Sequence, residues 1–398
     1  MVARPRARRM RIFSLLLTAF AAAMSVGALG QTPAPAPARE VPWLPLISND
    51  QKVLLTTAEV NGRNAVALID TGSGNVILSR HLAEQLGRAL TPIGEATSVG
   101  GQQKFWKAEG IRLAFGGLRA PEAAVQVSDF SAVETVLGRP IDLVIGASFL
   151  SQHSIEVDLH HARIRVGSVP ADDPGAVAVP VRYDRTTRRM TVPGVLAGVR
   201  LPIMLDTGAD TDFTISDEAL EQLPASARKL TTFMVAGGGG TEVETIIDLP
   251  GLDLGPLSLG RTQVNATKAG GLLAKAGVPA SVGMGVLARY NFVLDAPTGR
   301  LLLHRRVDPP PPAPKSTVGV QGTYKADRIA ILHIMANSPA ERAGLRAGDE
   351  ICVVNGEKVV DGWAHSPMRS WGVRPSGQKY TILLCSGRTV ELVSAAFY

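Results

Sequence analysis

Two stretches of this chain end a short apolar run with the same three residues: Ala67-Leu68-Ile69-Asp70-Thr71-Gly72-Ser73 and Met204-Leu205-Asp206-Thr207-Gly208-Ala209-Asp210. A glycine stands eight residues before each aspartate, at Gly62 and Gly198. Apolar runs that are this short and bounded by glycine are typical of buried strands rather than of helices. The sequence therefore predicts two copies of a strand that carries an aspartate at its end.

A second motif repeats at nearly the same distance along the chain. Ile145-Gly146-Ala147-Ser148-Phe149-Leu150 leads to Asp158, and Val282-Gly283-Met284-Gly285-Val286-Leu287 leads to Asp295, an offset of 137 residues. The two Asp-Thr-Gly stretches are offset by 136 residues. A nearly constant offset over two different motifs indicates an internal duplication, in which each copy forms one structural unit.

Proline-rich segments divide the chain of 398 residues, which is long enough for two or three domains. Thr32–Arg39 reads TPAPAPAR and Asp308–Pro314 reads DPPPPAP, and both compositions are typical of extended tethers. We therefore expect six parts: a signal peptide (1–30), a Pro/Ala linker (31–40), lobe one (41–170), lobe two (171–307), a Pro-rich linker (308–315) and a C-terminal domain (316–398).

Both repeated units are predicted to be mainly β, because their apolar runs are too short for helices. Short helices are expected only at Leu82–Leu86 and Ala219–Leu223. Ser79, Ser216 and Asp217 stand where an N-cap is needed, since their side-chain oxygens can accept bonds from the first helical N–H groups.

The N-terminus has the composition of a secretory signal. Five arginines precede the apolar run Ile12–Leu29, and small residues end that run at Ala28-Leu29-Gly30. Cleavage after residue 30 would lower the formal net charge from +6 to +1, which leaves no basic surface typical of nucleic-acid binding. The alternative is an uncleaved membrane anchor, because the run has almost the length of a spanning helix. In both cases the body lies outside the cytoplasm, and we expect a periplasmic or secreted protein.

Paired aspartates on two symmetric loops suit acid and base chemistry. If the two copies pack about a two-fold axis, both loops meet at the axis and bring Asp70 and Asp206 together. Two adjacent carboxyl groups cannot both be charged, so the pair shares one proton and supplies an acid and a base at the same pH. Such a pair can activate water without a metal, a cofactor or a covalent intermediate. For a single Asp-Thr-Gly, the alternative is a structural turn.

The two motifs resemble the active-site motifs of the pepsin/retropepsin superfamily of aspartic peptidases, over roughly residues 41–307. In that family each lobe has an apolar-apolar-Gly strand that braces the active-site loop, and Val144-Ile145-Gly146 and Ser281-Val282-Gly283 occupy that place. The resemblance implies a two-lobed acid-protease barrel fold. It also implies a catalytic pair and two supporting loops, which are Asp70 with Thr71 and Gly72, and Asp206 with Thr207 and Gly208.

The resemblance further implies glycine-rich hairpin flaps that close over the substrate. Val99-Gly100-Gly101 and Gly237-Gly238-Gly239-Gly240 fit that role, so Gly100, Gly101, Gly237 and Gly238 are predicted to contact substrate. This chain departs from the family in two ways. Each copy is shorter than a pepsin lobe although both copies lie in one chain, and Ser281 stands where a larger apolar residue is usual.

The C-terminal domain resembles a PDZ domain, on the segments Ile329–Ile334, Ser338–Leu345, Gly348–Ile351 and Val354–Gly356. The pattern predicts a strand, a one-turn helix opened by Ser338-Pro339, a second strand and an Asn-Gly hairpin turn. The resemblance implies that Val318, Gly319 and Val320 form a loop for a peptide carboxylate, and that a helix over Asp361–Trp371, interrupted at Pro367, lies beside the groove. The alternative is a PDZ-like module that only packs on the catalytic region.

The two cysteines, Cys352 and Cys385, both fall in this last domain. We interpret each as a small apolar residue on its own strand. An oxidising compartment would also permit a disulfide between them. The histidines are scattered and predict no metal site.

Three functional hypotheses follow. The first is an aspartic-type endopeptidase that cleaves polypeptides with Asp70 and Asp206, with the PDZ domain binding substrate or partner peptides. The second is a catalytically inactive peptide-binding or scaffold protein of the cell envelope. In the third, lobes pair between two chains, but two copies in one chain favour pairing within a monomer, because the linker sets a high local concentration.

Overall fold

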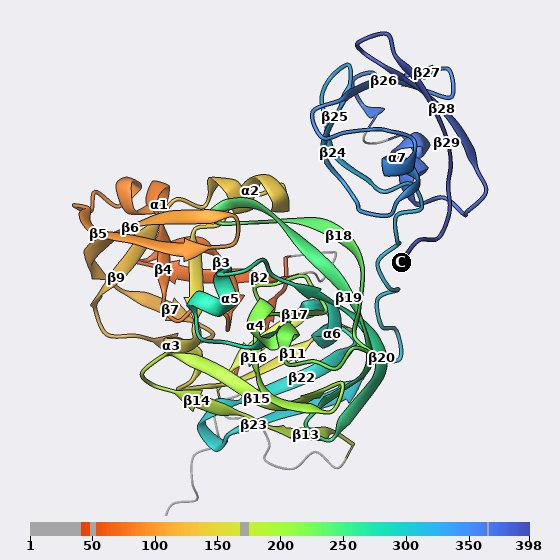
Figure 1. Cartoon of the computed structure of the whole chain (residues 1–398). Helices are drawn as coiled ribbons and strands as arrows, with labels where there is room; N and C mark the ends of the chain where they lie inside the picture. The colour runs from red at the N-terminus through yellow and green to blue at the C-terminus, as the bar shows by residue number, and fades with distance from the viewer. Residues whose placement is uncertain (1–40, 48–52, 168–174, 364–365) are drawn as a thin grey trace, which may run out of the picture. The chain divides into compact units, whose positions relative to one another are not determined.

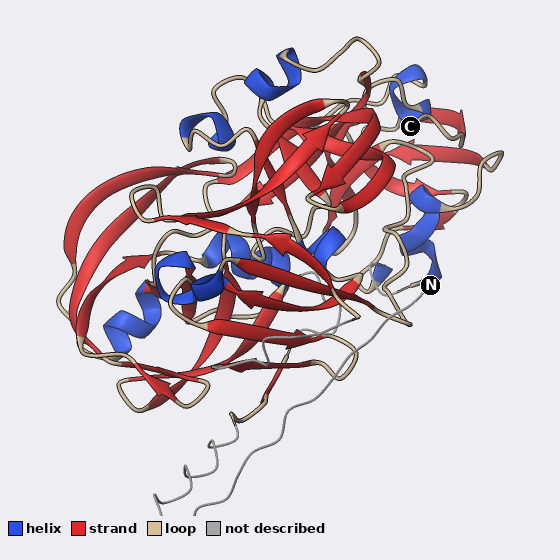
Figure 2. Cartoon of the chain, turned by 90° about the horizontal axis from the view of Figure 1, so that it is seen from below, coloured by secondary structure: helices blue, strands red, loops and turns tan. Residues whose placement is uncertain are grey.

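A computed structural model describes residues 41–47, 53–167, 175–363 and 366–398 (Figure 1). The expected signal peptide and the linker at Thr32–Arg39 lie outside these residues. Strands predominate and the helices are short, as expected for a mainly β chain (Figure 2). Within the described ranges no helix is long and apolar enough to cross a membrane.

The first copy builds a nine-stranded sheet. Its strands are β2 (Leu54–Val60), β3 (Arg63–Asp70), β4 (Ile77–Ser79), β5 (Thr91–Ser98), β6 (Gly101–Ile111), β7 (Leu113–Phe115), β8 (Leu118–Arg119), β9 (Ala123–Ser128) and β10 (Leu143–Gly146). They lie in the order β5-β6-β9-β4-β10-β3-β2-β7-β8. The aspartate strand β3 is therefore central, between the hairpin partner β2 and the parallel strand β10.

The second copy builds an eight-stranded sheet with the same central arrangement. Its strands are β14 (Arg182–Asp184), β15 (Arg189–Leu196), β16 (Val199–Leu205), β17 (Phe213–Ile215), β18 (Arg228–Gly237), β19 (Gly240–Leu254), β20 (Leu257–Ala266) and β21 (Ala280–Val282). Strand β16 leads to Asp206 and lies between the hairpin partner β15 and the parallel strand β21. The repeat read from the motifs is thus a repeat of structure.

A third sheet joins the two lobes. It consists of β1 (Leu44–Pro45), β11 (Ser154–Asp158), β12 (Arg163–Val166), β13 (Val177–Pro180), β22 (Tyr290–Asp295) and β23 (Arg300–Arg305). The lobes meet where β11 pairs antiparallel with β22, with Ile155 opposite Leu294. One buried apolar cluster extends through both lobes and includes Ile69, Ile145 and Val282. Burial of apolar surface in a shared core fixes the lobes to one another.

Short helices connect the strands. They are α1 (Arg80–Gln85), α2 (Ser131–Leu137), α3 (Ala147–Leu150), α4 (Asp217–Glu221), α5 (Leu272–Lys275), α6 (Met284–Leu287) and the 3₁₀ turn η1 (Ala296–Thr298). The predicted caps are confirmed for α1 and α4, because the Ser79 hydroxyl accepts from Leu82 N and the Ser216 hydroxyl from Ala219 N. Asp217 is the first helical residue rather than the cap. The sequence missed the other helices, most of which are single turns too short to show a period.

The C-terminal domain has its own sheet and core. Its elements are β24 (Val320–Tyr324), β25 (Ile329–Ile334), α7 (Pro339–Arg342), β26 (Glu350–Val354), β27 (Glu357–Lys358), the 3₁₀ helix η3 (Pro367–Val373), β28 (Lys379–Leu384) and β29 (Thr389–Val393). Ser338 caps α7, and Asn355 and Gly356 have the positive φ of the predicted Asn-Gly turn. The helix expected over Asp361–Trp371 instead begins at Pro367, a residue suited to a first helical position because it has no N–H.

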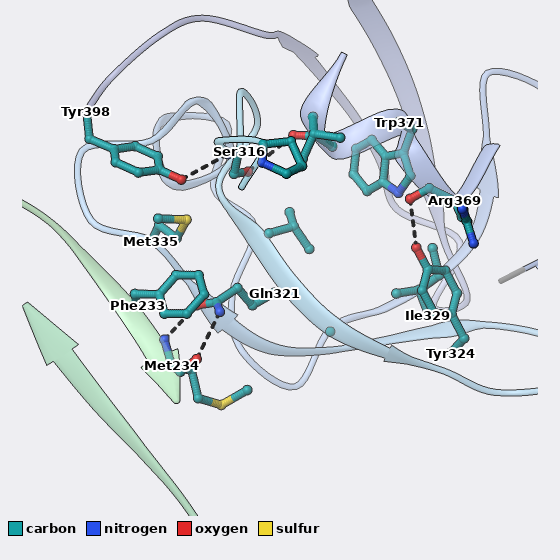
Figure 3. Close-up of a pocket in the computed structure, with 15 residues that line it drawn as sticks. Phe233, Met234, Ser316, Gln321, Tyr324, Ile329, Met335, Arg369, Trp371 and Tyr398 are labelled. Atoms are coloured by element: carbon teal, nitrogen blue, oxygen red, sulfur yellow. Dashed lines mark hydrogen bonds between the residues drawn. The ribbon is translucent and has the colours of Figure 1, made fainter. Parts of the chain in front are cut away.

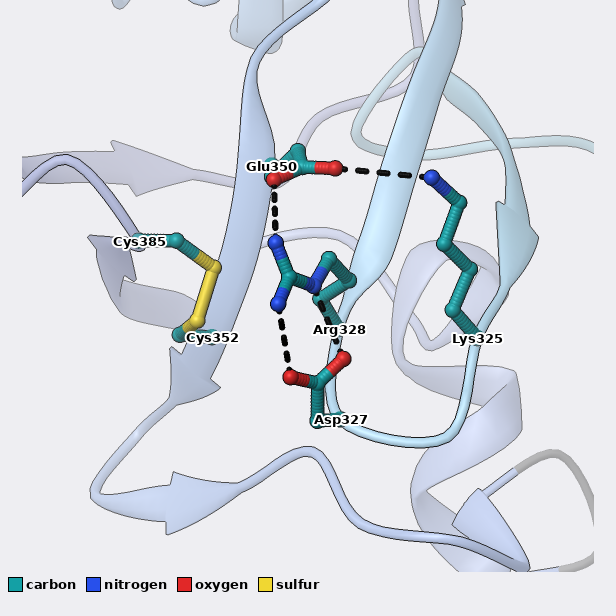
Figure 4. The surroundings of a disulfide bond; sticks show 6 residues. All are labelled: Lys325, Asp327, Arg328, Glu350, Cys352 and Cys385. Atoms are coloured by element: carbon teal, nitrogen blue, oxygen red, sulfur yellow. Dashed lines mark hydrogen bonds and ion pairs between the residues drawn. A yellow bond between two sulfur atoms is a disulfide. The ribbon is translucent and has the colours of Figure 1, made fainter.

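The two cysteines form a disulfide between neighbouring strands (Figure 4). Cys352 lies in β26 and Cys385 directly follows β28, and these two strands pair. Their Cα atoms are 5.1 Å apart, within the range that a disulfide spans. The interpretation of each cysteine as an isolated apolar residue is therefore wrong, because strand pairing places them opposite one another although 33 residues separate them.

Candidate active site

Parallel strand pairing holds each aspartate at the end of a buried strand. In lobe one β10 runs parallel to β3 and places Gly146 opposite Asp70. In lobe two β21 runs parallel to β16, and the Asp206 N–H donates to Val282 O at 3.0 Å. Ser281, the departure from the family pattern, is buried and lies opposite Met204 without breaking this pairing. Both loops are therefore fixed from beneath.

Two threonines cross-link the loops. The Thr71 N–H donates to Thr207 Oγ1 at 3.1 Å, and the Thr207 N–H donates to Thr71 Oγ1 at 3.0 Å. Each hydroxyl then donates across the axis, Thr71 to Leu205 O at 2.8 Å and Thr207 to Ile69 O at 2.7 Å. Both side chains are buried, so each makes its full set of bonds only while the two loops stay together.

Glycine in each loop permits the aspartate of the other loop to approach. A Cβ on Gly72 would overlap the Asp206 carboxyl group, and a Cβ on Gly208 would overlap the Asp70 carboxyl group. Gly146 and Gly283 are equally restricted, because a Cβ there would collide with backbone carbonyls of the two active-site loops. The four glycines are required by contact rather than by backbone angle, since none of them has a positive φ.

The carboxyl groups of Asp70 and Asp206 form a coupled pair in one chain. Burial is the largest cause of a raised pKa at both residues, and a hydrogen bond joins the two side chains. Both aspartates remain partly exposed to solvent, which a group that binds a water molecule requires. Burial, followed by the charge of Asp70, raises the pKa of Asp206 to about 8.

The two carboxyl groups are not equivalent. Asp70 Oδ1 accepts from the N–H groups of Gly72 at 2.9 Å and Ser73 at 3.1 Å, whereas Asp206 Oδ1 accepts from Gly208 N at 3.1 Å. The hydrogen bond between the pair lowers the pKa of Asp70 and raises that of Asp206. The pair therefore shares one proton, so that one carboxyl group is protonated while the other is ionised.

The predicted flap glycines lie at the tips of two hairpins, β5–β6 and β18–β19, which meet each other. The Gly239 N–H donates to Val99 O at 2.9 Å. A Cβ on Gly237 would collide with Val99, and one on Gly238 with the side chain of Gln103. Gly100 and Gly101 both have positive φ, which explains why glycine stands there.

Sequence reasoning gave no role to Arg189, at the start of β15. Burial lowers the pKa of this guanidinium group, and Asp206 raises it in part when its carboxyl group is ionised. Its Nε is buried without a hydrogen-bond partner, and Nη1 contacts Met204 Sδ at 3.5 Å. The one feature of the sequence that could have indicated Arg189 is its position, seventeen residues before Asp206. The first copy has Val53 at the corresponding position before Asp70.

The predicted carboxylate loop of the PDZ domain precedes and enters β24. Val318 is fully buried in the domain core, and the Gly319 N–H donates to Ser316 Oγ at 2.8 Å. Val320 pairs with Ile334 as the first residue of β24. A peptide carboxylate would have to displace the Ser316 hydroxyl to reach the Gly319 N–H, and the role of this loop stays a prediction.

The chemistry of the site follows from its parts. An ionised and a protonated carboxyl group lie side by side, which is what acid and base catalysis on a bound water requires. In the part of the chain that the structure describes, no three His, Cys, Asp or Glu side chains are placed to hold a metal ion.

Comparison with known proteins finds two families in this chain. The aspartyl protease family matches residues 56–149 and 192–286, and the PDZ domain family matches residues 310–367. DNA damage-inducible protein 1 of Cryptococcus neoformans var. neoformans serotype D, in strains JEC21 and B-3501A, is 31% identical over 120 residues. That match covers 29% of this chain and 26% of each relative. The family matches confirm the resemblance drawn from the motifs and the mainly β fold class.

Proposed function

We propose that this chain, which contains two segments of the aspartyl protease family and a C-terminal PDZ domain, is an endopeptidase acting through Asp70 and Asp206. The observation that carries the proposal is the reciprocal Thr71–Thr207 cross-link, which holds the two carboxyl groups against each other. A chain under no requirement to keep this pair would not need a glycine beside each carboxyl group.

The asymmetry of the pair assigns the roles. Asp70 takes a proton from the bound water as the water oxygen attacks the carbonyl carbon, and Asp206 gives its proton to the carbonyl oxygen. The product is a neutral tetrahedral diol. The Asp70 carboxyl group then protonates the amide nitrogen, Asp206 recovers a proton from one diol hydroxyl, and the carbon–nitrogen bond breaks. Both aspartates return to their starting protonation states, and one water has been consumed.

The substrate is an extended polypeptide. The hairpin tips meet through Gly239 and Val99, and the proposed substrate path runs between these hairpins and the carboxyl pair. Extended backbone bound beside β-hairpins makes main-chain hydrogen bonds that do not depend on side-chain identity. In this proposal the PDZ domain binds substrate or partner peptides, and the catalytic unit is a monomer.

The protein acts outside the cytoplasm in this proposal, in the periplasm or as a secreted enzyme. The arginine-rich start and apolar run of the sequence support export. The Cys352–Cys385 disulfide supports the same compartment, since such bonds persist in oxidising surroundings. Cell fractionation with a C-terminal tag tests this, and a cytoplasmic signal would contradict it.

Cleavage of denatured casein by the purified protein, from pH 3 to pH 8, tests the proposal. Asp70→Asn and Asp206→Asn should each abolish cleavage while the circular dichroism spectrum stays that of wild type. Asp210→Asn is the matched control, because Asp210 is exposed and only four residues from Asp206. If wild type and Asp70→Asn release the same fragments, or neither cleaves, the inactive scaffold replaces the peptidase.

A further inference from the structure

The outer strand of the lobe-two flap has an edge that needs a partner. Among the described residues, β18 is the last strand of its sheet and pairs only with β19, so its other edge has no strand partner. Open strand edges are usually covered or interrupted, because they otherwise recruit other strands. In this chain the cover comes from the C-terminal domain.

Gln321 of β24 takes the place of a neighbouring strand (Figure 3). Its side-chain carbonyl accepts from the Met234 N–H at 2.7 Å, and its amide nitrogen donates to Met234 O at 3.1 Å. A paired strand would make the same two bonds to one residue. Asn in this position would be one methylene shorter, so the length of Gln is part of the fit.

A second group of contacts lies further back along β18. The Thr231 hydroxyl donates to Ala336 O at 2.6 Å, and the Ala336 N–H donates to Thr232 Oγ1 at 3.0 Å. The Asn337 side chain donates to Leu230 O at 3.1 Å, and His333 Nε2 lies 2.9 Å from Thr232 Oγ1. Contacts from two separate segments of the domain, β24 and the turn after β25, make this an oriented interface.

We propose that the PDZ domain is docked on the outer edge of the lobe-two flap and holds that flap closed, with Gln321 as the positioning residue. This rests on the proposed function insofar as flap closure matters to catalysis. Met234 is three residues before Gly237, about 10 Å along the strand from the flap tip. A restraint at that distance limits the motion of the tip, where Gly239 contacts Val99.

A cavity of the C-terminal domain shares a wall with the same strand. A cavity of about 370 Å³ is lined by Phe233 and Met234 of β18 and by residues of the C-terminal domain that include Val320, Trp371 and Val373 (Figure 3). Any ligand in this cavity touches the flap, so its affinity depends on where the flap lies. The coupling is reciprocal. If a ligand in the cavity changes the equilibrium constant of flap closure by some factor, closing the flap changes the affinity for that ligand by the same factor.

Hydrogen exchange of backbone amides in the full chain tests docking without relying on catalysis. Gln321→Met keeps the side-chain length but removes both bonds, and the Met234 amide should then exchange about tenfold faster, the effect of losing one net hydrogen bond. The Gly239 amide, which reports flap-tip contact, should also exchange about threefold or more faster. Gln378→Met, at an exposed glutamine of the same domain, should leave both amides unchanged.

Each outcome decides the proposal. Unchanged exchange at Met234 in Gln321→Met means that the domain is not docked in solution. Faster exchange at Met234 with unchanged exchange at Gly239 means that docking does not hold the flap, which also overturns the proposal. Thr232→Val, which removes the bonds to Ala336 and His333, must reproduce the Gly239 effect. Absence of casein cleavage would refute the proposed function and leave these exchange results standing.

Discussion

The two lobes repeat one plan but differ where the chemistry needs a difference. In lobe one Asp70 Oδ1 accepts from the N–H groups of Gly72 and Ser73, whereas in lobe two Asp206 Oδ1 accepts from Gly208 N, and the Ala209 N–H also lowers the pKa of Asp206. Each lobe has a hairpin at the end of its sheet, β5–β6 in lobe one and β18–β19 in lobe two, and in lobe two Gln321 bonds to the outer strand of that hairpin. Duplication supplies a symmetric frame, and small departures from symmetry then make the surroundings of the two carboxyl groups unequal.

Replacing either aspartate should have the largest effect. Asp70→Asn removes the base and Asp206→Asn removes the acid, so each should lower kcat on a peptide substrate by at least about a thousandfold. Steady-state cleavage of a fluorogenic peptide measures this. If one variant kept wild-type kcat, only one lobe would be catalytic and the comparison of the two loops would lose its meaning.

The pH dependence should show which carboxyl group holds the proton. Since the pKa of Asp206 is raised to about 8 in the fold, its protonated form stabilises the native state fully below its unfolded value near 4. That contribution falls as pH rises through about 8, and cleavage should fall over the same range. Urea denaturation at several pH values measures the first effect. Asp206→Asn should flatten the curve between pH 4 and 8, and an unchanged curve would contradict the assignment.

Removing either threonine hydroxyl of the cross-link should lower the free energy of unfolding by a similar amount. Thr71→Ala and Thr207→Ala each leave a buried N–H of the opposite loop without its acceptor, at a cost of about 1–3 kcal/mol in the free energy of unfolding. The double variant should cost less than the sum of the two, because the bonds are reciprocal. Thr→Ser at either position keeps the hydroxyl and serves as the control. Strict additivity would show that the loops do not support one another.

In the flap of lobe one, replacing a glycine by alanine should raise KM at the tip but have little effect elsewhere. A Cβ on Gly100 would collide with the backbone of Gly240, so Gly100→Ala should separate the tips and raise KM by about tenfold. Gly94→Ala is the matched control, since Gly94 also has a positive φ but has open space around it. Equal effects of the two variants would mean that backbone strain, not tip contact, is measured.

The smallest effect, a change in thermal stability, is expected at Glu244 of lobe two, four residues after Gly240. Lobe one has Phe105 at the corresponding position, four residues after Gly101. Burial is the main cause that raises the pKa of Glu244 to about 7, with a further rise from Glu242. Stability from its protonated form is present below its unfolded value near 4.5 and is lost as pH rises through about 7. Glu244→Gln keeps an acceptor for Asn265 and should remove this part of the pH dependence. Calorimetric melting at pH 5 and pH 8 measures it.

The sequence predicted the parts of the molecule that repeat or obey local rules. The offset of Asp-Thr-Gly motifs predicted two lobes, Ser79 and Ser216 predicted helix starts, and Asn355-Gly356 predicted a hairpin. Contacts between distant segments that the repeat did not imply were missed. Cys352 and Cys385 became a pair only through the register of β26 with β28, which no local pattern encodes.

The sequence by itself determined which groups can do chemistry, because an aspartate at the end of each of two duplicated strands is a property of the chain alone. Only the tertiary structure decided what those groups do. Which aspartate keeps the proton depends on backbone N–H groups and burial, and the docking of Gln321 on Met234 depends on an interface between residues 87 positions apart. Protonation and docking are set by surroundings, and surroundings exist only once the chain has folded.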